Sequence, residues 1–167
     1  MRYLVITDIH GSSYYLEKAL TKYKTLNLDK IIILGDILYH GPRNDLPEGY
    51  NPKEVIALLN PLSHNILAVR GNCDAEVDQM VLQFPLFDEA NLHGVLLIHG
   101  HHLDEIKDDG YVLVGHYHIN KISDKHVFLG SLSIPKDTHH TYGVIIDGIL
   151  RSYDLLDDTL LYEVKLW

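Results

Sequence analysis

The run Lys30-Ile31-Ile32-Ile33-Leu34-Gly35-Asp36 is an uninterrupted apolar segment that stops at a glycine and a carboxylate. Such a run is typical of a strand that is buried on both faces of a parallel sheet. Tyr3 to Thr7 forms a similar β-rich run before it, and Asn65 to Val69 forms another after it. These three runs predict neighbouring strands of an α/β protein.

Two helical patterns separate these strands. The first follows Ser12 or Ser13, either of which can cap a helix, and its apolar residues repeat at helical spacing. These residues are Leu16, Ala19, Leu20 and Tyr23. The second begins at Asn51-Pro52, where a capping side chain precedes a proline at the first helical position. Its inward stripe consists of Val55, Leu58, Leu59 and Leu62.

The second half of the chain is predicted to be mainly strand. Asp36 to Tyr50 is the longest irregular segment before it, and a loop of that length is more often functional than idle. Turn signals such as Asp147-Gly148 separate the later β-rich segments. We interpret residues 1–167 as one α/β domain in which two sheets lie face to face with helices outside. The predicted strands of the second half are Val95 to Ile98, Tyr111 to Val114, Val127 to Leu129, Tyr142 to Ile146 and Ile149 to Leu155.

Composition and charge argue against several classes of function. The chain has 167 residues and a formal net charge of −9, which disfavours electrostatic binding of nucleic acid or an anionic membrane over a large surface. Its single cysteine, Cys73, cannot form an intramolecular disulfide. No apolar run reaches the ~18 residues of a membrane-spanning helix, and no signal-peptide pattern is present. We therefore expect a cytoplasmic protein.

A glycine beside a metal-capable residue recurs where predicted strands end. Residues beyond the carboxyl ends of strands in open α/β sheets converge on one ligand site. Taken singly, Asp36 or Asn72 could cap a turn, and His116 and His118 could be a polar pair on an edge strand. Five such elements in one chain together predict a metal site. They are Asp8-Ile9-His10-Gly11, Gly35-Asp36, Gly71-Asn72, His99-Gly100 and Gly115-His116-Tyr117-His118.

In these elements the chain resembles the calcineurin-like metallophosphoesterase superfamily, whose members carry D-x-H, G-D, G-N-[H or C]-[D or E], H-G and G-H-x-H in this order. All five blocks are present between residues 8 and 118. Within this superfamily the chain resembles the bacterial YfcE-type phosphodiesterases. The resemblance implies a four-layer αββα sandwich of two mixed sheets with helices outside. The shared local runs are Gly35 to Leu38, His40 to Asn44, Leu46 to Tyr50, Val69 to Asp74 and Gly130 to Lys136.

The resemblance also implies two divalent metal ions, with manganese as the expected metal. Carboxylate, amide and imidazole donors without thiolate suit Mn, Fe, Co, Ni or Zn better than Ca or Mg. The implied reaction is hydrolysis of a phosphodiester by in-line attack of a hydroxide that bridges the metals, which lie roughly 3.5–4 Å apart in such sites. The implied ligands are Asp8, His10 and His118 for the first metal, Asn72, His99 and His116 for the second, and Asp36 as the bridge.

Cys73 stands where many members of the superfamily carry a histidine. That histidine can protonate the leaving oxygen or help to hold the phosphate. A thiol, with a reference pKa of about 8.5, is a poorer general acid at neutral pH, so diesters with phenol-like leaving groups should be favoured. Cys73 could instead merely pack beneath the metal loop, and His101 could supply the proton.

Three further positions have two interpretations each. Arg43 is the candidate for an extra contact to substrate oxygens, because a guanidinium fork matches phosphate geometry, but it could equally be solvent-exposed or ion-paired. Asp74 is interpreted chiefly as the cap of a helix that begins near Ala75, with orientation of a ligand as the alternative. Tyr39 could line the cleft or simply pack against its neighbours.

Two other functions fit the same fold. One is a phosphomonoesterase, and the other is a non-catalytic metal-binding scaffold like a eukaryotic relative that has lost part of its ligand set. Every ligand position of the family is intact in this chain, which favours an enzyme. The expected partner is a small phosphodiester, with neither extended nucleic-acid binding nor a membrane, and the resemblance suggests a homo-oligomer.

Overall fold

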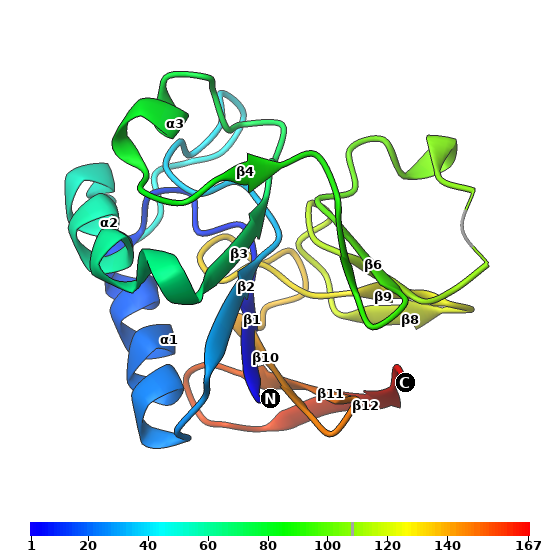
Figure 1. Cartoon of the computed structure of the whole chain (residues 1–167). Coiled ribbons are helices and arrows are strands. Elements are labelled where there is room, and N and C mark those ends of the chain that lie inside the picture. Colours follow the sequence, from blue (N-terminus) through cyan, green and yellow to red (C-terminus); the bar gives the residue numbers. More distant parts are fainter. Residues whose placement is uncertain (108) are drawn as a thin grey trace.

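The computed structural model describes residues 1–107 and 109–167, which form two mixed sheets lying face to face, as predicted (Figure 1). In the seven-stranded sheet, β1 through β4 run parallel, and the remaining strands are antiparallel to their neighbours. Its order is β12 (Leu160–Lys165), β11 (Ile149–Asp154), β10 (Thr141–Ile146), β1 (Tyr3–Ile6), β2 (Lys30–Ile33), β3 (Ile66–Val69) and β4 (Leu86–Phe87). The five-stranded sheet has the order β5 (Ala90–Leu92), β6 (Val95–Ile98), β7 (Val112–Val114), β9 (His126–Phe128) and β8 (Lys121–Ser123).

The helices begin where the capping signals place them. In α1 (Ser13–Thr25), the Ser12 side chain accepts a hydrogen bond from the Tyr15 backbone N–H. In α2 (Pro52–Leu59), the Asn51 side chain accepts from the Glu54 backbone N–H in the same way. A 3₁₀ helix, η1 (Asn60–Asn65), continues directly from α2. Among the described residues, no helix combines the length and the apolar character needed to cross a bilayer.

Apolar side chains fill the space between the two sheets and the space beneath the helices. Tyr3, Val5 and Ile32 of the larger sheet pack against Leu97 and Leu113 of the smaller one. The opposite face of the larger sheet packs against α1 and α2 (Figure 1). The outer face of the smaller sheet is covered by the short 3₁₀ helix η2 (Leu103–Glu105) and the residues that follow it. Within the described chain, the outer helical layer on that side is therefore a single 3₁₀ turn.

The predicted strands are present, with boundaries shifted by at most one residue. The Asp147-Gly148 turn between β10 and β11 has positive φ at both residues, 52° and 77°, as a type I′ hairpin turn requires. The sequence pattern does not predict β4, β5, β8 or β12. The first three contain only two or three residues each, and β12 is a partly exposed edge strand, so its apolar alternation is weak.

The carboxyl ends of the parallel strands in both sheets meet at one end of the molecule. The Thr7 hydroxyl, just after β1, donates to the Leu34 carbonyl at 3.2 Å. The His99 ring, just after β6, donates from Nδ1 to the same carbonyl at 2.6 Å. The first residue after β1, the first after β2 and the first after β6 are thereby joined across the two sheets.

Candidate metal centre

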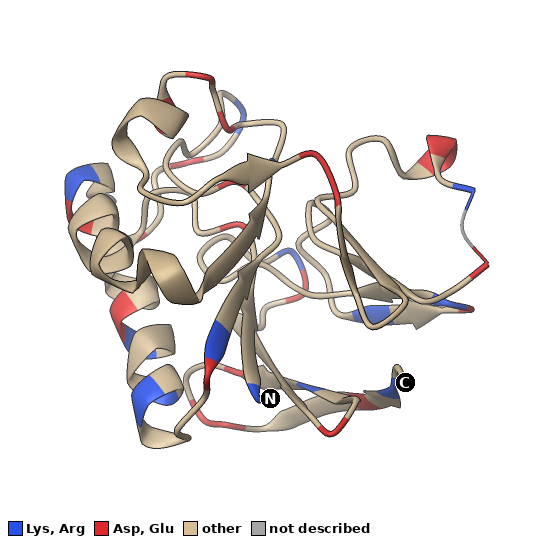
Figure 2. Cartoon of the chain, viewed as in Figure 1, with Lys and Arg blue, Asp and Glu red and all other residues tan. Residues whose placement is uncertain are grey.

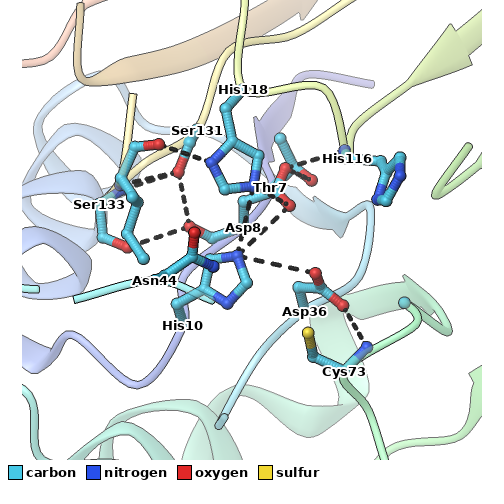
Figure 3. Close-up of polar contacts among 12 residues, drawn as sticks. Thr7, Asp8, His10, Asp36, Asn44, Cys73, His116, His118, Ser131 and Ser133 are labelled. Atoms are coloured by element: carbon cyan, nitrogen blue, oxygen red, sulfur yellow. Dashed lines mark hydrogen bonds and ion pairs between the residues drawn. The ribbon is translucent and has the colours of Figure 1, made fainter. Parts of the chain in front are cut away.

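The seven predicted ligands lie together at this junction of the strand ends. Three overlapping groups have candidate ligand atoms within 4.8 Å of one another. Figure 3 shows Asp8, His10, Asp36 and His118 turned toward one another. The groups are Asp8 with His10 and His118, His10 with Asp36 and Cys73, and Asp36 with His99 and His116.

Asp8 presents one free carboxylate oxygen to the first group. Its Oδ2 accepts hydrogen bonds from the Thr7 hydroxyl at 2.8 Å and from the His116 backbone N–H at 3.0 Å. Its Oδ1 is fully buried and accepts no hydrogen bond from the described residues, although His118 Nε2 lies 3.2 Å away and His10 Nε2 3.7 Å away. A buried anionic oxygen among imidazoles, with no donor aimed at it, fits a cation.

Asp36 lies between the two sets of imidazoles. Its Oδ2 is 3.6 Å from His10 Nε2 and 3.3 Å from His99 Nε2, while its Oδ1 accepts the Cys73 backbone N–H at 2.8 Å. His99 Nε2 is also 3.0 Å from Asn72 Oδ1. One oxygen of Asp36 therefore faces both groups of imidazoles.

Backbone carbonyls orient three of the four imidazoles. Nδ1 of His10 lies 2.8 Å from the Tyr39 carbonyl, Nδ1 of His99 lies 2.6 Å from that of Leu34, and Nδ1 of His118 lies 2.5 Å from that of Ile134. In the neutral ring, a proton held on Nδ1 leaves a lone pair on Nε2, which points into the site. His116 is different, because its Nδ1 lies 3.2 Å from His99 Nε2 and faces the centre itself.

The two acidic ligands are held ionised by their surroundings. Burial alone would raise the pKa of Asp8, but contacts with His10 and His118 outweigh it and hold the pKa well below its usual value. Burial alone would also raise the pKa of Asp36, but contacts with His99 outweigh burial and lower that pKa. Burial alone would lower the pKa of His99, but Asp36 and Asp8 raise it to about 9. Burial and the nearby His99 lower the pKa of His116 to about 4. The buried carboxylates of Asp8 and Asp36 are therefore stable only with positive charge nearby.

Five of the seven candidate ligands have a left-handed backbone, with φ between 47° and 64°. Non-glycine residues rarely adopt this conformation, although Asp, Asn and His tolerate it better than most others. It costs of order 1–3 kcal/mol per residue and persists where the surrounding structure imposes it. The five are Asp8, His10, Asp36, His116 and His118.

Two glycines allow the loops that follow β2 and β3 to touch. A Cβ atom on Gly35 would lie 2.6 Å from the Gly71 nitrogen and 2.8 Å from His99 Nδ1, which is too close for either atom to remain in place. A Cβ atom on Gly71 would overlap the Asp36 carboxylate. The close approach that the Gly-Asp and Gly-Asn pairs predict is therefore present.

The sequence interpretation of Asp74 as chiefly a helix cap is wrong. Its Oδ2 accepts the backbone N–H groups of Asp36 at 2.8 Å and Gly71 at 2.7 Å, and its Oδ1 accepts that of Ile37 at 2.8 Å. The Ala75 backbone N–H is instead bonded to the Asp78 carboxylate, and α3 (Asp78–Val81) begins only there. Asp74 therefore fastens the Asp36 loop to the Asn72 loop.

The turn at residues 130–136 holds the opposite side of the centre. The Ser131 and Ser133 hydroxyls donate to the Asp8 backbone carbonyl at 3.0 and 3.1 Å (Figure 3). The Ile134 carbonyl orients His118, and the Lys136 backbone N–H donates to the His118 carbonyl at 2.9 Å. The resemblance marks this turn, but no local pattern reveals that both serines reach a carbonyl more than 120 residues away.

A cleft of about 710 Å³ opens over the centre. Arg43 and Cys73 line it, and so do Tyr39, whose exposed fraction is 42%, and Tyr117, at 37%. Arg43 is exposed and makes no side-chain ion pair with the described residues, so the structure agrees with the solvent-exposed interpretation, and its contact to substrate stays a prediction. Burial and the Asp36 carboxylate raise the pKa of the Cys73 thiol to about 12, so the thiol is protonated at neutral pH.

His101 lies apart from that cleft. It lines a second pocket of about 360 Å³ together with His99 and Arg70. Its ring centroid is 5.6 Å from that of His99 and 6.3 Å from that of His116. Burial and the charge on His99 lower the pKa of His101, which disfavours the protonated form that a general acid needs.

Comparison with known proteins finds relatives that match most of the chain and share its fold. A family model described as the calcineurin-like phosphoesterase superfamily domain matches residues 1–147. The chain is 36% identical to phosphodiesterase YfcE of Escherichia coli strain K12 over an alignment of 181 positions, which covers 99% of this chain and 98% of the relative. A solved structure of YfcE, a phosphoesterase from E. coli, matches 100% of both chains with a TM-score of 0.90. Vps29 of Chaetomium thermophilum matches 98% of this chain and 97% of its own with a TM-score of 0.60, and at 17% identity it shares the fold alone.

Proposed function

Because the chain belongs to the calcineurin-like phosphoesterase superfamily, we propose that it is a metal-dependent phosphodiesterase. The observation that carries the proposal is the place of Asp36 Oδ2 between His10 and His99, since one oxygen shared by two imidazole sets suits a dinuclear site. The similarity to a relative named a phosphodiesterase supports the choice of a diester over a monoester.

The donor set supports two divalent ions, for which we propose manganese, with Fe, Co, Ni and Zn as alternatives. Such a metal pair neutralises phosphoryl charge and acidifies water enough for attack at neutral pH. We assign the shared position to Asp36, whose Oδ1 is fixed by the Cys73 backbone and whose Oδ2 remains available. The other proposed ligands are Asp8, His10 and His118 on one side and Asn72, His99 and His116 on the other.

Other side chains of the cleft would bind and orient the substrate. We assign to the exposed Arg43 guanidinium, which lines the cleft, a contact to non-bridging oxygens of the reacting phosphate. The Cys73 thiol lines the same cleft near Asp36, where it is proposed to face the leaving group without donating a proton efficiently. His101 is the alternative proton donor from the adjoining pocket, in which it would need to be protonated.

Hydrolysis of bis-p-nitrophenyl phosphate tests the proposal directly. Metal-stripped protein should release no p-nitrophenol, and added Mn²⁺ should restore the release, because the buried Asp8 and Asp36 carboxylates hold the metals that the reaction needs. Circular dichroism of the stripped protein serves as the control for folding. Folded protein that stays inactive with Mn, Fe, Co, Ni and Zn would support the non-catalytic scaffold instead.

The Cys73→His variant is expected to raise the ratio of monoester to diester hydrolysis. An imidazolium would supply the proton that poor leaving groups need, and proton donation of this kind typically contributes about 10²–10⁴-fold. The measurement compares p-nitrophenyl phosphate with bis-p-nitrophenyl phosphate, using Cys73→Ser as the matched control without an acid. If both variants keep the wild-type ratio, Cys73 does not govern the choice of leaving group.

The remaining proposals concern the whole molecule. We propose that residues 1–167 act as one domain, in the cytoplasm, and as a homo-oligomer, on the strength of the family resemblance and the lone cysteine. Extended nucleic acid is an unsuitable substrate, because acidic residues outnumber basic ones by 23 to 14 and the two kinds are interspersed along the chain (Figure 2).

A further inference from the structure

Two basic side chains of the metal-site cleft have no acidic partner. Arg43, in the loop after β2, and Lys136, in the turn after β9, are both exposed and line the same cleft of about 710 Å³. Among the described residues, neither side chain has an ion pair or a hydrogen bond. In a chain of net charge −9, two unpaired cations at one site indicate a site that attracts anions.

Three basic residues elsewhere in the described part of the chain, Lys22, Arg70 and Arg151, have an acidic partner within 4.0 Å, whereas most of the others have none. Lys22 lies 2.6 Å from Asp158, and Arg151 lies 2.5 Å from Glu163. The cleft is distinguished by holding two such bases beside the candidate metal ligands, while the carboxylates among its described lining residues, Asp36 and Asp74, already accept backbone N–H groups.

The backbone around Lys136 is held firmly at the rim of the metal centre. The Lys136 backbone N–H donates to the His118 carbonyl at 2.9 Å, and two residues earlier the Ile134 carbonyl orients the His118 ring. The neighbouring hydroxyl of Ser131 caps the same turn by accepting the Ile134 backbone N–H at 2.9 Å. Lys136 therefore projects from a fixed point beside a candidate metal ligand.

The charge of a simple diester does not account for these two cations. A phosphodiester carries a single negative charge, and two divalent ions with Asp8 and Asp36 already provide excess positive charge at the reacting phosphate. Resting on the proposed phosphodiesterase activity, we propose that the substrate is a phosphodiester carrying a second phosphate group, which Lys136 binds while Arg43 contacts the reacting phosphate. The exposed rings of Tyr39 and Tyr117 line the same cleft and offer apolar surface to the organic part between the two phosphates.

Two substrates with the same leaving group test this inference. One is the p-nitrophenyl ester of thymidine 5′-monophosphate, and the other is the same ester with an added 3′-phosphate. With Mn²⁺-loaded protein at low ionic strength, the 3′-phosphate should raise kcat/KM by about tenfold or more, mainly through a lower KM. The gain should shrink in about 0.5 M KCl, because salt screens exposed charges.

Variants at two lysines separate the proposal from a general charge effect. Lys136→Met should remove most of the gain and Lys136→Arg should keep it. Lys53→Met is the matched control, since Lys53 is an exposed lysine on α2 that does not line the cleft. Equal kcat/KM for the two substrates, or an unchanged gain in Lys136→Met, would overturn the assignment.

A binding measurement gives the same answer without turnover. Isothermal titration should show that thymidine 3′,5′-bisphosphate binds at least about tenfold more tightly than thymidine 5′-monophosphate, and that Lys136→Met loses this preference. Equal affinity of the two nucleotides would contradict the second-phosphate site. Failure of the phosphodiesterase proposal is a separate result, namely folded, metal-loaded protein that hydrolyses neither ester.

Discussion

Replacement of Asp36 by asparagine should abolish phosphodiesterase activity. The Asp36→Asn side chain keeps its size and an oxygen that can accept the Cys73 backbone N–H, but it loses the negative charge that both imidazole groups face. Loss of an outer partner of a metal site typically costs about 10–100-fold in affinity or activity, and a shared ligand should cost more. Bis-p-nitrophenyl phosphate turnover and bound manganese per chain are the two measurements.

The control for Asp36→Asn is Asp45→Asn in the same loop. Asp45 is exposed and does not line the cleft, so its variant should match wild type in turnover and metal content. If Asp36→Asn keeps more than a tenth of wild-type turnover while Asp45→Asn is normal, the assignment of Asp36 as the shared ligand is wrong.

Asp74→Asn should lose both metal affinity and stability, although Asp74 is not proposed to touch a metal. Its carboxylate accepts the backbone N–H groups of Asp36, Ile37 and Gly71. An amide offers only one oxygen, so at least one buried donor loses its acceptor, at a cost of about 1–3 kcal/mol in the free energy of unfolding. Manganese affinity should fall by about 10–100-fold, because the loops that carry Asp36 and Asn72 are no longer fastened.

The matched control for this variant is Asp78→Asn, which removes a carboxylate four residues further along. Among the described residues, the Asp78 carboxylate accepts a hydrogen bond from the Ala75 backbone N–H alone, at an exposed position, and Asp78 does not line the cleft. Chemical denaturation and manganese titration of both variants give the result. Wild-type manganese affinity in Asp74→Asn would show that its three hydrogen bonds serve the fold and not the centre.

The sequence reveals the candidate ligands because each follows the strand that positions it. Asp8 and His10 come directly after β1 and Asp36 after β2, so chain order alone brings them to one edge of the sheet. The contacts that hold these ligands are different, because they join distant parts of the chain. Asp74 reaches backbone groups 37 and 38 residues earlier, and Ser133 reaches a carbonyl 125 residues earlier.

The side of the centre on which a residue lies also depends on tertiary structure. His101 is only two residues from His99, yet it opens into a separate pocket instead of the cleft that holds Cys73. Arg43 could be recognised as a basic loop residue, but its lack of an acidic partner depends on which carboxylates fold near it. For the same reason the edge strand β12, whose pattern is weak, becomes recognisable only when it pairs with β11.

The left-handed backbone at five candidate ligands links the lifetime of the chain to its metal supply. Native proteins are stable by only about 5–15 kcal/mol, and each such residue subtracts of order 1–3 kcal/mol from the folded state. A ligand that binds only the folded form adds stability with its concentration, about 4 kcal/mol at a thousand times its Kd. In a cell short of the metal, the enzyme would therefore be inactive and also less abundant. More chains would be unfolded, and proteases remove unfolded chains.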